Sequence, residues 1–435
     1  MNFLLKHGFV IDPSCGISDR MDLVIKNGKV FKPSCDDFAG YETIDCSGKV
    51  VLPGFIDAHV HLRDPGFEYK EDIQTGSKSA LAGGVTTLFC MPNTVPVIDN
   101  LSTVEYIREK NIKHGFVNIY PIGAITVGSK GAKPVDFSSL VASGVIAFSD
   151  DGMWVSDSSV LADALKISRT DRFRIIQHCE DHAFTRSGVI ADGKIARKFK
   201  LPIIHPASEY CAVYRDVSLC EMMDGAIHIA HISTERSVEI IRDAKNRGVD
   251  VTCEVTPHHL VLSNDDILCD DAVFKVNPPL QAKSDCDALI DGLADGTIDI
   301  IATDHAPHEE IEKQRGFKNA PFGLIGMETA FSVLYTKLVK TNKVSLEVIV
   351  EKFSTNPAKI FGLKNKGSLS DGVDADLTVI DLNEQYKINK DKLFSKSKNT
   401  PYHGWDVFGK ITDVFVGGGH LFNNGKILDS EAERV

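Results

Sequence analysis

The middle of the chain alternates short apolar runs with longer amphipathic stretches. Eight of the runs have the length and composition typical of buried strands: residues 55–61, 85–91, 117–125, 145–148, 173–179, 226–232, 249–255 and 298–303. The stretch 233–247 spaces its apolar residues at the helical period, and Gly248 follows it as a helix stop signal. Eight strand–helix units over about 250 residues predict a TIM-type (β/α)8 barrel of the α/β class.

The two ends of the chain have a different pattern, in which short apolar runs alternate with turns. Asn27-Gly28 lies between two such runs and predicts a hairpin. Neither end has enough apolar residues for a core of its own. We therefore predict that residues 1–52 and 356–435 combine into one small β-sandwich domain, beside a catalytic barrel at 53–355. The long stretch 184–218 is expected to form a helical excursion over the barrel mouth.

Composition narrows the class of protein. A chain of 435 residues, 43% hydrophobic and 25% charged, suits a water-soluble barrel with a smaller module. No apolar run reaches about 18 residues and the N-terminal apolar run is too short for a secretory signal, so we expect a cytoplasmic protein without a membrane partner. The net charge of −12 argues against nucleic-acid binding. Ten cysteines without a CxxC pair favour a reduced protein.

The strand ends predict a metal centre. His59 and His61 lie two residues apart on a strand, so their side chains share one face and can bind one ion together. Because active sites of such barrels lie at the carboxyl ends of the strands, metal-ligand residue types should meet there: His59, His61, Asp151, His178, His231 and Asp304. Six ligands exceed one tetrahedral site, so of one or two Zn²⁺ ions we favour two.

Several of these residues also have a simpler interpretation. A single histidine at a strand end is more often hydrogen-bonded for structure than bound to metal, so the set counts and no one member does. Asp150 and Asp151 precede Gly152 and could form a plain turn, which leaves the choice between the two carboxylates open. His258 and His259 are expected to support the site or the fold, and His228 is expected to be ordinary.

Together these motifs resemble one family. The chain contains Asp57-Ala-His59-Val-His61-Leu-Arg63-Asp-Pro-Gly, Met91-Pro-Asn93-Thr, Phe148-Ser-Asp-Asp151-Gly, Asn277-Pro-Pro-Leu, Ala302-Thr-Asp304-His-Ala-Pro-His308, Ala320-Pro-Phe-Gly323 and Asn399-Thr-Pro-Tyr. They resemble dihydroorotases of the long, class I type, in the amidohydrolase superfamily, over nearly the whole chain. The resemblance implies reversible cyclisation of N-carbamoyl-L-aspartate to L-dihydroorotate, a step of pyrimidine (UMP) biosynthesis.

The resemblance also implies roles for individual residues. Asp304 would be both ligand and catalytic proton carrier. The substrate would be held by Arg63, Asn93, Asn277 and His308 and by backbone groups of Phe322 and Gly323. An arginine makes a two-point contact with a carboxylate, and asparagine supplies neutral donors that orient it. A homodimer and an association with aspartate carbamoyltransferase are further family expectations.

Two features of the sequence bear on the alternative functions, of which another cyclic-amide hydrolase is the nearest. Hydantoinases and allantoinases, which are related cyclic-amide hydrolases, typically place a carboxylated lysine on the fourth strand, and residues 141–152 contain no lysine. Asp151 is the expected substitute. The family usually continues Asn-Pro-Pro-Leu with arginine, where this chain has Gln281. A non-catalytic scaffold for aspartate carbamoyltransferase is a third alternative, which the retention of all six ligand types disfavours.

Overall fold

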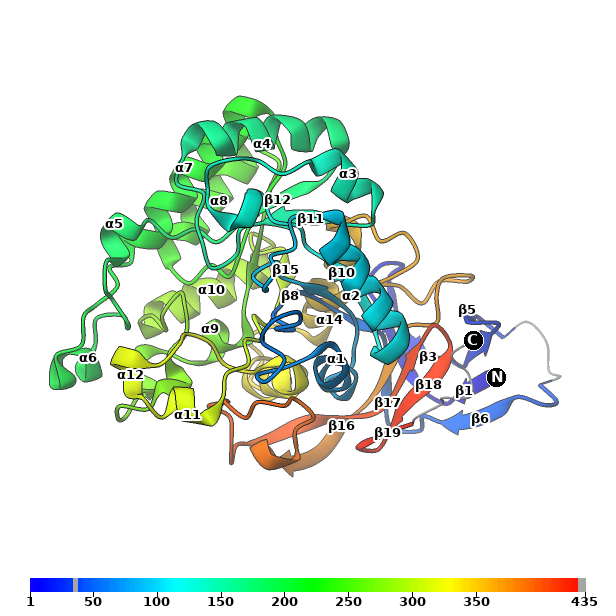
Figure 1. Ribbon diagram of the computed structural model, residues 1–435. Coiled ribbons are helices and arrows are strands. Elements are labelled where there is room, and N and C mark those ends of the chain that lie inside the picture. Colours follow the sequence, from blue (N-terminus) through cyan, green and yellow to red (C-terminus); the bar gives the residue numbers. More distant parts are fainter. Residues whose placement is uncertain (34–37, 429–435) are drawn as a thin grey trace.

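Eight parallel strands form a closed barrel in the computed structural model, which describes residues 1–33 and 38–428 (Figure 1). The strands are β8 (Phe55–Val60), β9 (Val85–Cys90), β10 (Asn118–Pro121), β11 (Ala147–Ser149), β12 (Arg174–Gln177), β13 (Ile227–Ile229), β14 (Val251–Val255) and β15 (Ile300–Ile301). They pair in sequence order as two ladders, β8 to β10 and β11 to β15. Bridges Gly123–Phe148 and Val60–His305 join the ladders. All eight predicted strands are confirmed, each shorter than its apolar run.

Helices surround the barrel because each turns one apolar stripe towards the strands. In α8, Val238, Ile241 and Ala244 are buried, and the Thr234 side chain accepts a hydrogen bond from the Ser237 amide at the first turn. The outer helices are α1 (Ile73–Ala82), α2 (Leu101–His114), α3 (Phe137–Ala142), α4 (Ser158–Asp171), α7 (Ala207–Met223), α8 (Glu235–Asn246) and α10 (Lys283–Asp295). The helix predicted at 233–247 is therefore confirmed.

Shorter helices lie in the loops and after the last strand of the barrel. They are α5 (His182–Thr185), α6 (Lys194–Phe199), α9 (Pro257–Val261), α11 (Glu310–Lys313), α12 (Gly316–Asn319), α13 (Ala330–Leu334), α14 (Leu346–Val350) and α15 (Asn356–Ile360), with the π-helical turns η5 (Tyr335–Val339) and η6 (Glu351–Thr355). The long stretch 184–218 contains the end of α5, the whole of α6 and the first part of α7, so the predicted helices form there with loops between them. Its Val189 and Ile195 pack with Leu262 and Leu324 from the loops after β14 and β15, at the carboxyl end of the barrel.

The two ends of the chain form a second, β-rich unit. One sheet has the order β5-β4-β1-β6 and the other the order β19-β18-β17-β16-β7-β2-β3. Strands from the N-terminal part are β1 (Phe3–Lys6), β2 (Phe9–Asp12), β3 (Ile17–Arg20), β4 (Leu23–Lys26), β5 (Lys29–Phe31), β6 (Glu42–Asp45) and β7 (Val50–Pro53). Those from the C-terminal part are β16 (Leu377–Lys387), β17 (Asp406–Val416), β18 (Gly419–Asn423) and β19 (Lys426–Ile427).

Both ends contribute to one core, because neither supplies enough apolar surface alone. Phe3 and Ile25 of the first sheet pack with Val51, Leu377 and Phe415 of the second. Asn27 and Gly28 connect β4 to β5 with φ of 52° and 73°, the left-handed pair that a two-residue hairpin requires. The predicted β-sandwich is confirmed as part of the fold, and the boundaries at residues 52 and 355 stay a prediction.

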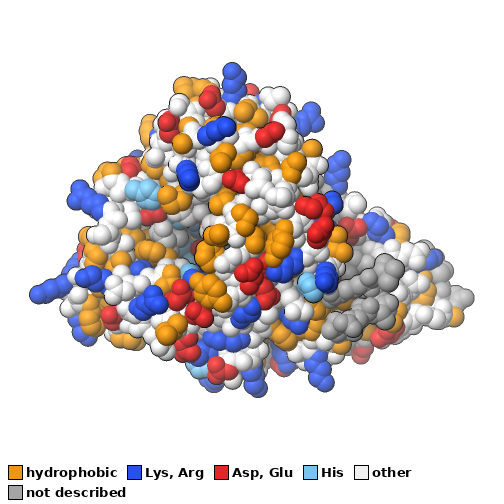
Figure 2. Space-filling model, in the orientation of Figure 1, with side chains coloured by type: hydrophobic (Ala, Val, Ile, Leu, Met, Phe, Trp, Pro, Cys, Tyr) orange, Lys and Arg blue, Asp and Glu red, His pale blue; other side chains and the backbone are white. Residues whose placement is uncertain are grey.

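Three further observations bear on the chemistry. No helix among residues 1–33 and 38–428 is long and apolar enough to cross a membrane. Nine cysteines in those residues are free thiols, and Cys35 lies outside them. Acidic and basic side chains are interspersed over the face seen in Figure 2. An anion that approaches this face must therefore be attracted by local groups.

Candidate active site

The six predicted ligand side chains meet at the carboxyl end of the barrel. His59 lies on β8, and the other five follow the ends of their strands within a few residues, so strand geometry alone brings them together. None exposes more than 8% of its surface. Two groups have ligand atoms within 4.8 Å of one another: His59, His61 and Asp151, and Asp151, His178 and His231. Asp151 belongs to both groups, which is the arrangement expected of a carboxylate shared by two ions.

Asp304 adds a second carboxylate to the first group. Its Oδ1 lies 2.9 Å from His61 Nε2 and 3.7 Å from His59 Nε2. Burial alone would raise the pKa of Asp304, but the hydrogen bond from His61 and the charges of both histidines hold it below its usual range. Burial and the neighbouring His178 and His59 lower the pKa of His231 to about 3. Burial would lower the pKa of His59 as well, but the Glu254 and Asp151 carboxylates raise it above its usual range. Since ionised carboxylates and neutral imidazoles are the forms that bind metal, an ion bound here would displace the proton of His59.

The structure also distinguishes the two adjacent aspartates. Asp150 turns away from the cluster and accepts hydrogen bonds from the amides of Ile125 and Thr126, at 2.8 and 3.0 Å. Asp151 instead has Oδ1 3.3 Å from His59 Nε2 and Oδ2 3.5 Å from His61 Nε2. Asp150 therefore shapes the turn, and Asp151 is the carboxylate that faces the cluster.

One orphaned atom tests whether this donor set fits a cation. His59 Nδ1 lies 2.6 Å from Glu254 Oε1, which leaves Nε2 as the free nitrogen. That Nε2 is buried and has no hydrogen-bond partner in the described part of the chain. A buried nitrogen without a partner is costly, unless a ligand that the protein is built to hold supplies the contact. The residues present therefore fit a divalent ion between His59, Asp151 and Asp304.

Sequence reasoning missed two carboxylates that orient these imidazoles. Glu254 on β14 holds His59 and also lies 3.1 Å from His228 Nε2, so His228 is more than an ordinary residue. Glu180 Oε2 lies 3.0 Å from His178 Nε2. This contact orients the His178 ring so that its Nδ1 lies 2.9 Å from His231 Nε2. A carboxylate that binds the far nitrogen of a ligand histidine fixes its tautomer and its orientation. A glutamate inside the apolar run 249–255 was the available signal for Glu254.

The six residues proposed to bind substrate lie beside this cluster. Arg63, Asn93, Asn277, His308, Phe322 and Gly323 line one cavity of about 230 Å³ together with the ligand residues His61, Asp151, His178, His231 and Asp304. Asn93 touches the cluster directly, since its Nδ2 donates to Asp151 Oδ2 at 3.2 Å and its Oδ1 lies 3.0 Å from His61 Nδ1. Asn277 Nδ2 donates to Glu180 Oε2 at 2.8 Å.

The opposite wall of the cavity carries positive charge. Arg63 Nε donates to the carbonyl of Pro307 at 3.2 Å, and its Nη2 lies 3.2 Å from His308 Nε2. Burial and the cations Arg63 and Lys70 lower the pKa of His308 to about 2, so His308 is a neutral imidazole. Gly323 has φ of 126°, and a Cβ there would lie 2.6 Å from the Ala306 Cβ. Only glycine lets this loop approach the site so closely.

Gln281, which replaces the arginine usual in the family, lies outside this cavity lining. It is buried, and its Nε2 is 3.4 Å from Ser233 Oγ, near the end of the loop between β13 and α8. His259 Nε2 donates to the carbonyl of Pro278 at 2.9 Å, which anchors the segment that contains Asn277. Gln281 therefore supports the loop before α8, and His259 supports the segment that contains Asn277. Within residues 1–33 and 38–428, neither side chain is hydrogen-bonded to the six ligand residues.

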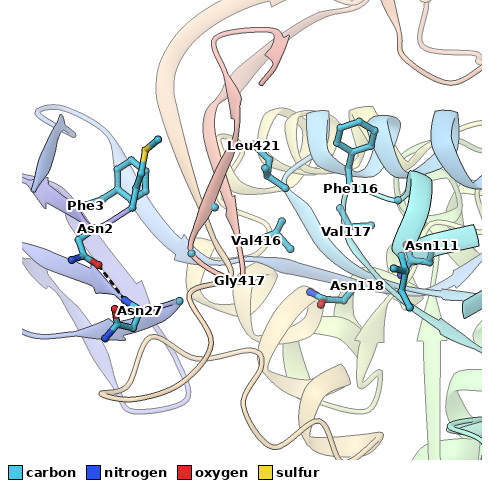
Figure 3. A pocket seen from close by; sticks show the side chains of 16 residues that line it. Asn2, Phe3, Asn27, Asn111, Phe116, Val117, Asn118, Val416, Gly417 and Leu421 are labelled. Carbon is cyan, nitrogen blue, oxygen red and sulfur yellow. Dashed lines mark hydrogen bonds between the residues drawn. The ribbon is translucent and has the colours of Figure 1, made fainter. Parts of the chain in front are cut away.

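A larger cavity elsewhere lacks comparable chemistry. It measures about 730 Å³ and lies between the small domain and the barrel (Figure 3). Its polar lining consists mainly of side-chain amides, from Asn2, Asn27, Asn111 and Asn118. The backbone N–H of Asn27 donates to Asn2 Oδ1 at 3.2 Å. Volume alone would select this cavity. The smaller one holds the imidazoles, the carboxylates and the guanidinium, and we take it as the active site.

Known proteins of one family are similar to this chain in sequence. A model of the Dihydro-orotase-like family matches residues 48–237. A dihydroorotase of Acetivibrio thermocellus is 46% identical over 416 residues, which are 95% of this chain and 97% of that protein. A dihydroorotase of Geobacter metallireducens is 46% identical over 420 residues, 96% of this chain and 99% of that protein.

Solved structures share the architecture. An L-hydantoinase (dihydropyrimidinase) from Arthrobacter aurescens is 26% identical, with a TM-score of 0.89 over 98% of this chain and 97% of that one. A dihydropyrimidinase from Brevibacillus agri is 24% identical, with a TM-score of 0.86 over 98% and 96%. These likenesses confirm the predicted fold class, a TIM-type barrel with a small β domain.

Proposed function

This chain belongs to the dihydroorotase family, and we propose that it interconverts N-carbamoyl-L-aspartate and L-dihydroorotate at the cavity between Arg63 and Asp304. The similarity to dihydroorotases over nearly the whole chain confirms the resemblance found in the sequence, and the protein is a cyclic amidohydrolase. The observation that carries the substrate assignment is the division of the cavity: carboxylates and imidazoles line one side, and Arg63 with His308 lines the other. Dihydroorotate has a ring amide for the first side and a carboxylate for the second.

We assign the metal to the carboxylate and imidazole side. His59, His61 and Asp304 would hold one ion, His178 and His231 a second, and Asp151 would join them. Zinc is the proposed metal, since histidine nitrogen and aspartate oxygen are its usual ligands, and we favour two ions over one. Divalent ions bound there would polarise the carbonyl under attack and activate the attacking water.

Asp304 moves the proton. In the hydrolytic direction a bond forms between the water oxygen and the ring carbonyl carbon, and the Asp304 carboxylate accepts the proton that the water loses. The bond from carbon to the ring nitrogen then breaks, and Asp304 delivers that proton to the departing nitrogen. Its lowered pKa keeps Asp304 ionised before attack and makes it a strong acid afterwards. Cyclisation runs the same steps in reverse.

Arg63 and His308 orient the substrate. Arg63 presents a charged fork to the carboxylate, and neutral His308 adds a donor from the same side. Asn93 and Asn277 flank the ligand cluster and supply neutral amide donors at the reacting end. Backbone groups of Phe322 and Gly323 complete the wall next to the ring.

The direct test measures turnover of L-dihydroorotate, hydantoin and allantoin by the purified protein. We expect rapid turnover of dihydroorotate and little of the other two, because they lack the carboxylate that Arg63 would bind. A preference for hydantoin or allantoin would support the alternative, a hydantoinase-like hydrolase. Absence of turnover for all three, with metal bound, would support a scaffold for aspartate carbamoyltransferase.

Three further expectations accompany this function. We propose a cytoplasmic enzyme, for which nine free cysteines in the described residues are support. A homodimer and an association with aspartate carbamoyltransferase are proposed from the family resemblance. Sedimentation of the protein alone and with the transcarbamoylase tests both.

A further inference from the structure

Lys70 is a buried cation that the proposed mechanism leaves without a role. It lies in the loop between β8 and α1, and its side chain is 11% exposed. Its Nζ lies 3.1 Å from His308 Nδ1 and 2.9 Å from Glu312 Oε1. The backbone of Lys70 is held at both ends, because its amide donates to the Phe67 carbonyl at 2.8 Å and its carbonyl accepts from Ser397 Oγ at 2.7 Å.

These contacts determine which nitrogen of His308 carries the proton. An ammonium can only donate, so His308 Nδ1 must accept from Lys70, and the single proton of the neutral ring must be on Nε2. A second contact requires the same tautomer. The Phe322 carbonyl can only accept, and it lies 2.7 Å from His308 Nε2. Two independent groups, on opposite sides of the ring, therefore favour one proton position.

The same tautomer creates an unusual meeting of donors. Arg63 Nη2 lies 3.2 Å from His308 Nε2, and both atoms carry hydrogens. Two donors at this distance repel each other unless an acceptor comes to lie between them. A carboxylate oxygen is such an acceptor: it can take a hydrogen bond from Arg63 and share the Nε2 proton of His308 with the Phe322 carbonyl in a three-centre bond. The pair is therefore prepared for an anion before the anion arrives.

We propose that Lys70 is a positioning residue that holds His308 in the Nε2–H tautomer, so that one oxygen of the substrate carboxylate accepts from Arg63 and shares the His308 proton with the Phe322 carbonyl. This inference rests on the proposed function only for the identity of the anion. The tautomer itself is a property of the free protein. Lys70 touches His308 and acts through it.

Glu312 shows why the lysine is needed. Its Oε2 lies 3.6 Å from His308 Nδ1. Without the ammonium that this carboxylate now binds, Glu312 would attract the ring proton to Nδ1. Nε2 would then become an acceptor that faces the Phe322 carbonyl and the substrate carboxylate, and both contacts would be repulsive. Loss of Lys70 should therefore reverse the tautomer rather than merely loosen the ring.

Nitrogen NMR of protein labelled with ¹⁵N-histidine tests the tautomer, with H308Q to identify the His308 signals. We expect the wild type to have a protonated Nε2 and a bare Nδ1. K70M should move the proton to Nδ1, and K70M/E312Q should return it to Nε2, because an uncharged amide in place of Glu312 attracts the proton less than the nearer Phe322 carbonyl does. As a matched control, K387M removes a lysine that pairs with Asp406 on the small domain and should change nothing. A proton on Nδ1 in the wild type, or an unchanged tautomer in K70M, would overturn the proposal.

Kinetics with L-dihydroorotate test the consequence. K70M should raise KM about tenfold or more, the usual effect of losing a hydrogen bond to a charged group, and change kcat much less. K70R keeps a donor-only cation and should retain most of the affinity, which separates this role from a purely structural one. A reversed tautomer with unchanged KM would refute the link to the carboxylate. Failure of the wild type to turn over dihydroorotate would refute the proposed function instead, and the NMR result would stand apart from it.

Discussion

The two sides of the active-site cavity are built differently. The ligand side stands on the barrel strands: His59 is part of β8, and its five companions lie within a few residues of strand ends. The opposite side stands on loops, with Arg63 and Lys70 between β8 and α1, and His308 and Phe322 in the connections after β15. Strand ends are fixed by the ladder, whereas loop groups are fixed only by their contacts. The ligand side is therefore placed by the strands and oriented by Glu254 and Glu180, whereas the position of the second side depends on contacts between loop residues.

The two sides also differ in charge. Asp151, Asp304, Glu180 and Glu254 give the ligand side four carboxylates, which suit cations. Arg63 and Lys70 give the other side its positive charge, which suits an anion. A substrate with an amide at one end and a carboxylate at the other satisfies both sides at once. Variants on the two sides should therefore fail in different kinetic parameters.

The largest effect is expected from D304N. Asparagine keeps the shape of the side chain but cannot accept the proton, so kcat for dihydroorotate should fall about 10³-fold or more. KM should change little, because the carboxylate contacts remain. Circular dichroism and thermal unfolding check that the variant folds. A variant that retained near-normal kcat would remove Asp304 from the chemistry.

The next largest effect is expected from R63M, which removes charge from the loop side. KM for dihydroorotate should rise about 30- to 100-fold, since a hydrogen-bonded charge pair contributes roughly 2–3 kcal/mol. Metal content should stay that of the wild type. Steady-state kinetics and metal analysis of the same preparation measure both. Unchanged KM and kcat would show that the carboxylate binds elsewhere.

E254Q tests the support of the ligand side. Glu254 holds His59 Nδ1 at 2.6 Å, and the amide of glutamine would weaken that contact. Metal affinity should fall about 10- to 100-fold, as for other groups that orient metal-binding histidines. Activity should recover when metal is added in excess, whereas the defect of R63M should not. Recovery of R63M by metal would erase the distinction between the two sides.

The smallest effect is expected from pH. Protonation of His308 would strengthen carboxylate binding as pH falls, but a pKa of about 2 keeps the ring neutral at pH 6 to 8. The ratio of KM between H308Q and the wild type should therefore be flat over this range. Taking the ratio cancels the titration of other groups. A ratio that grows towards pH 6 would show that His308 gains a proton with an ordinary pKa.

The difference between the sides also explains what could be predicted from sequence. Every barrel strand was predictable, because each is a continuous apolar run, and a ligand at a strand end is placed by the strand itself. The substrate-binding roles of Arg63 and His308 came only from the resemblance, since loop conformation decides where these side chains point. A glutamate inside the apolar run 249–255 marked Glu254 as unusual, but its contact partner, like those of Glu180 and Lys70, was not predictable. Each role depends on a side-chain contact, and those of Glu254 and Lys70 join residues about two hundred positions apart.

Metal analysis of two neighbouring variants tests the central claim most directly. Asp151 faces the ligand cluster and Asp150 faces the turn at Thr126, although the two residues are adjacent in sequence. In protein purified without chelators, D150N should keep the wild-type content of divalent ions and D151N should lose at least one ion per chain. Equal metal content in all three proteins would contradict the account.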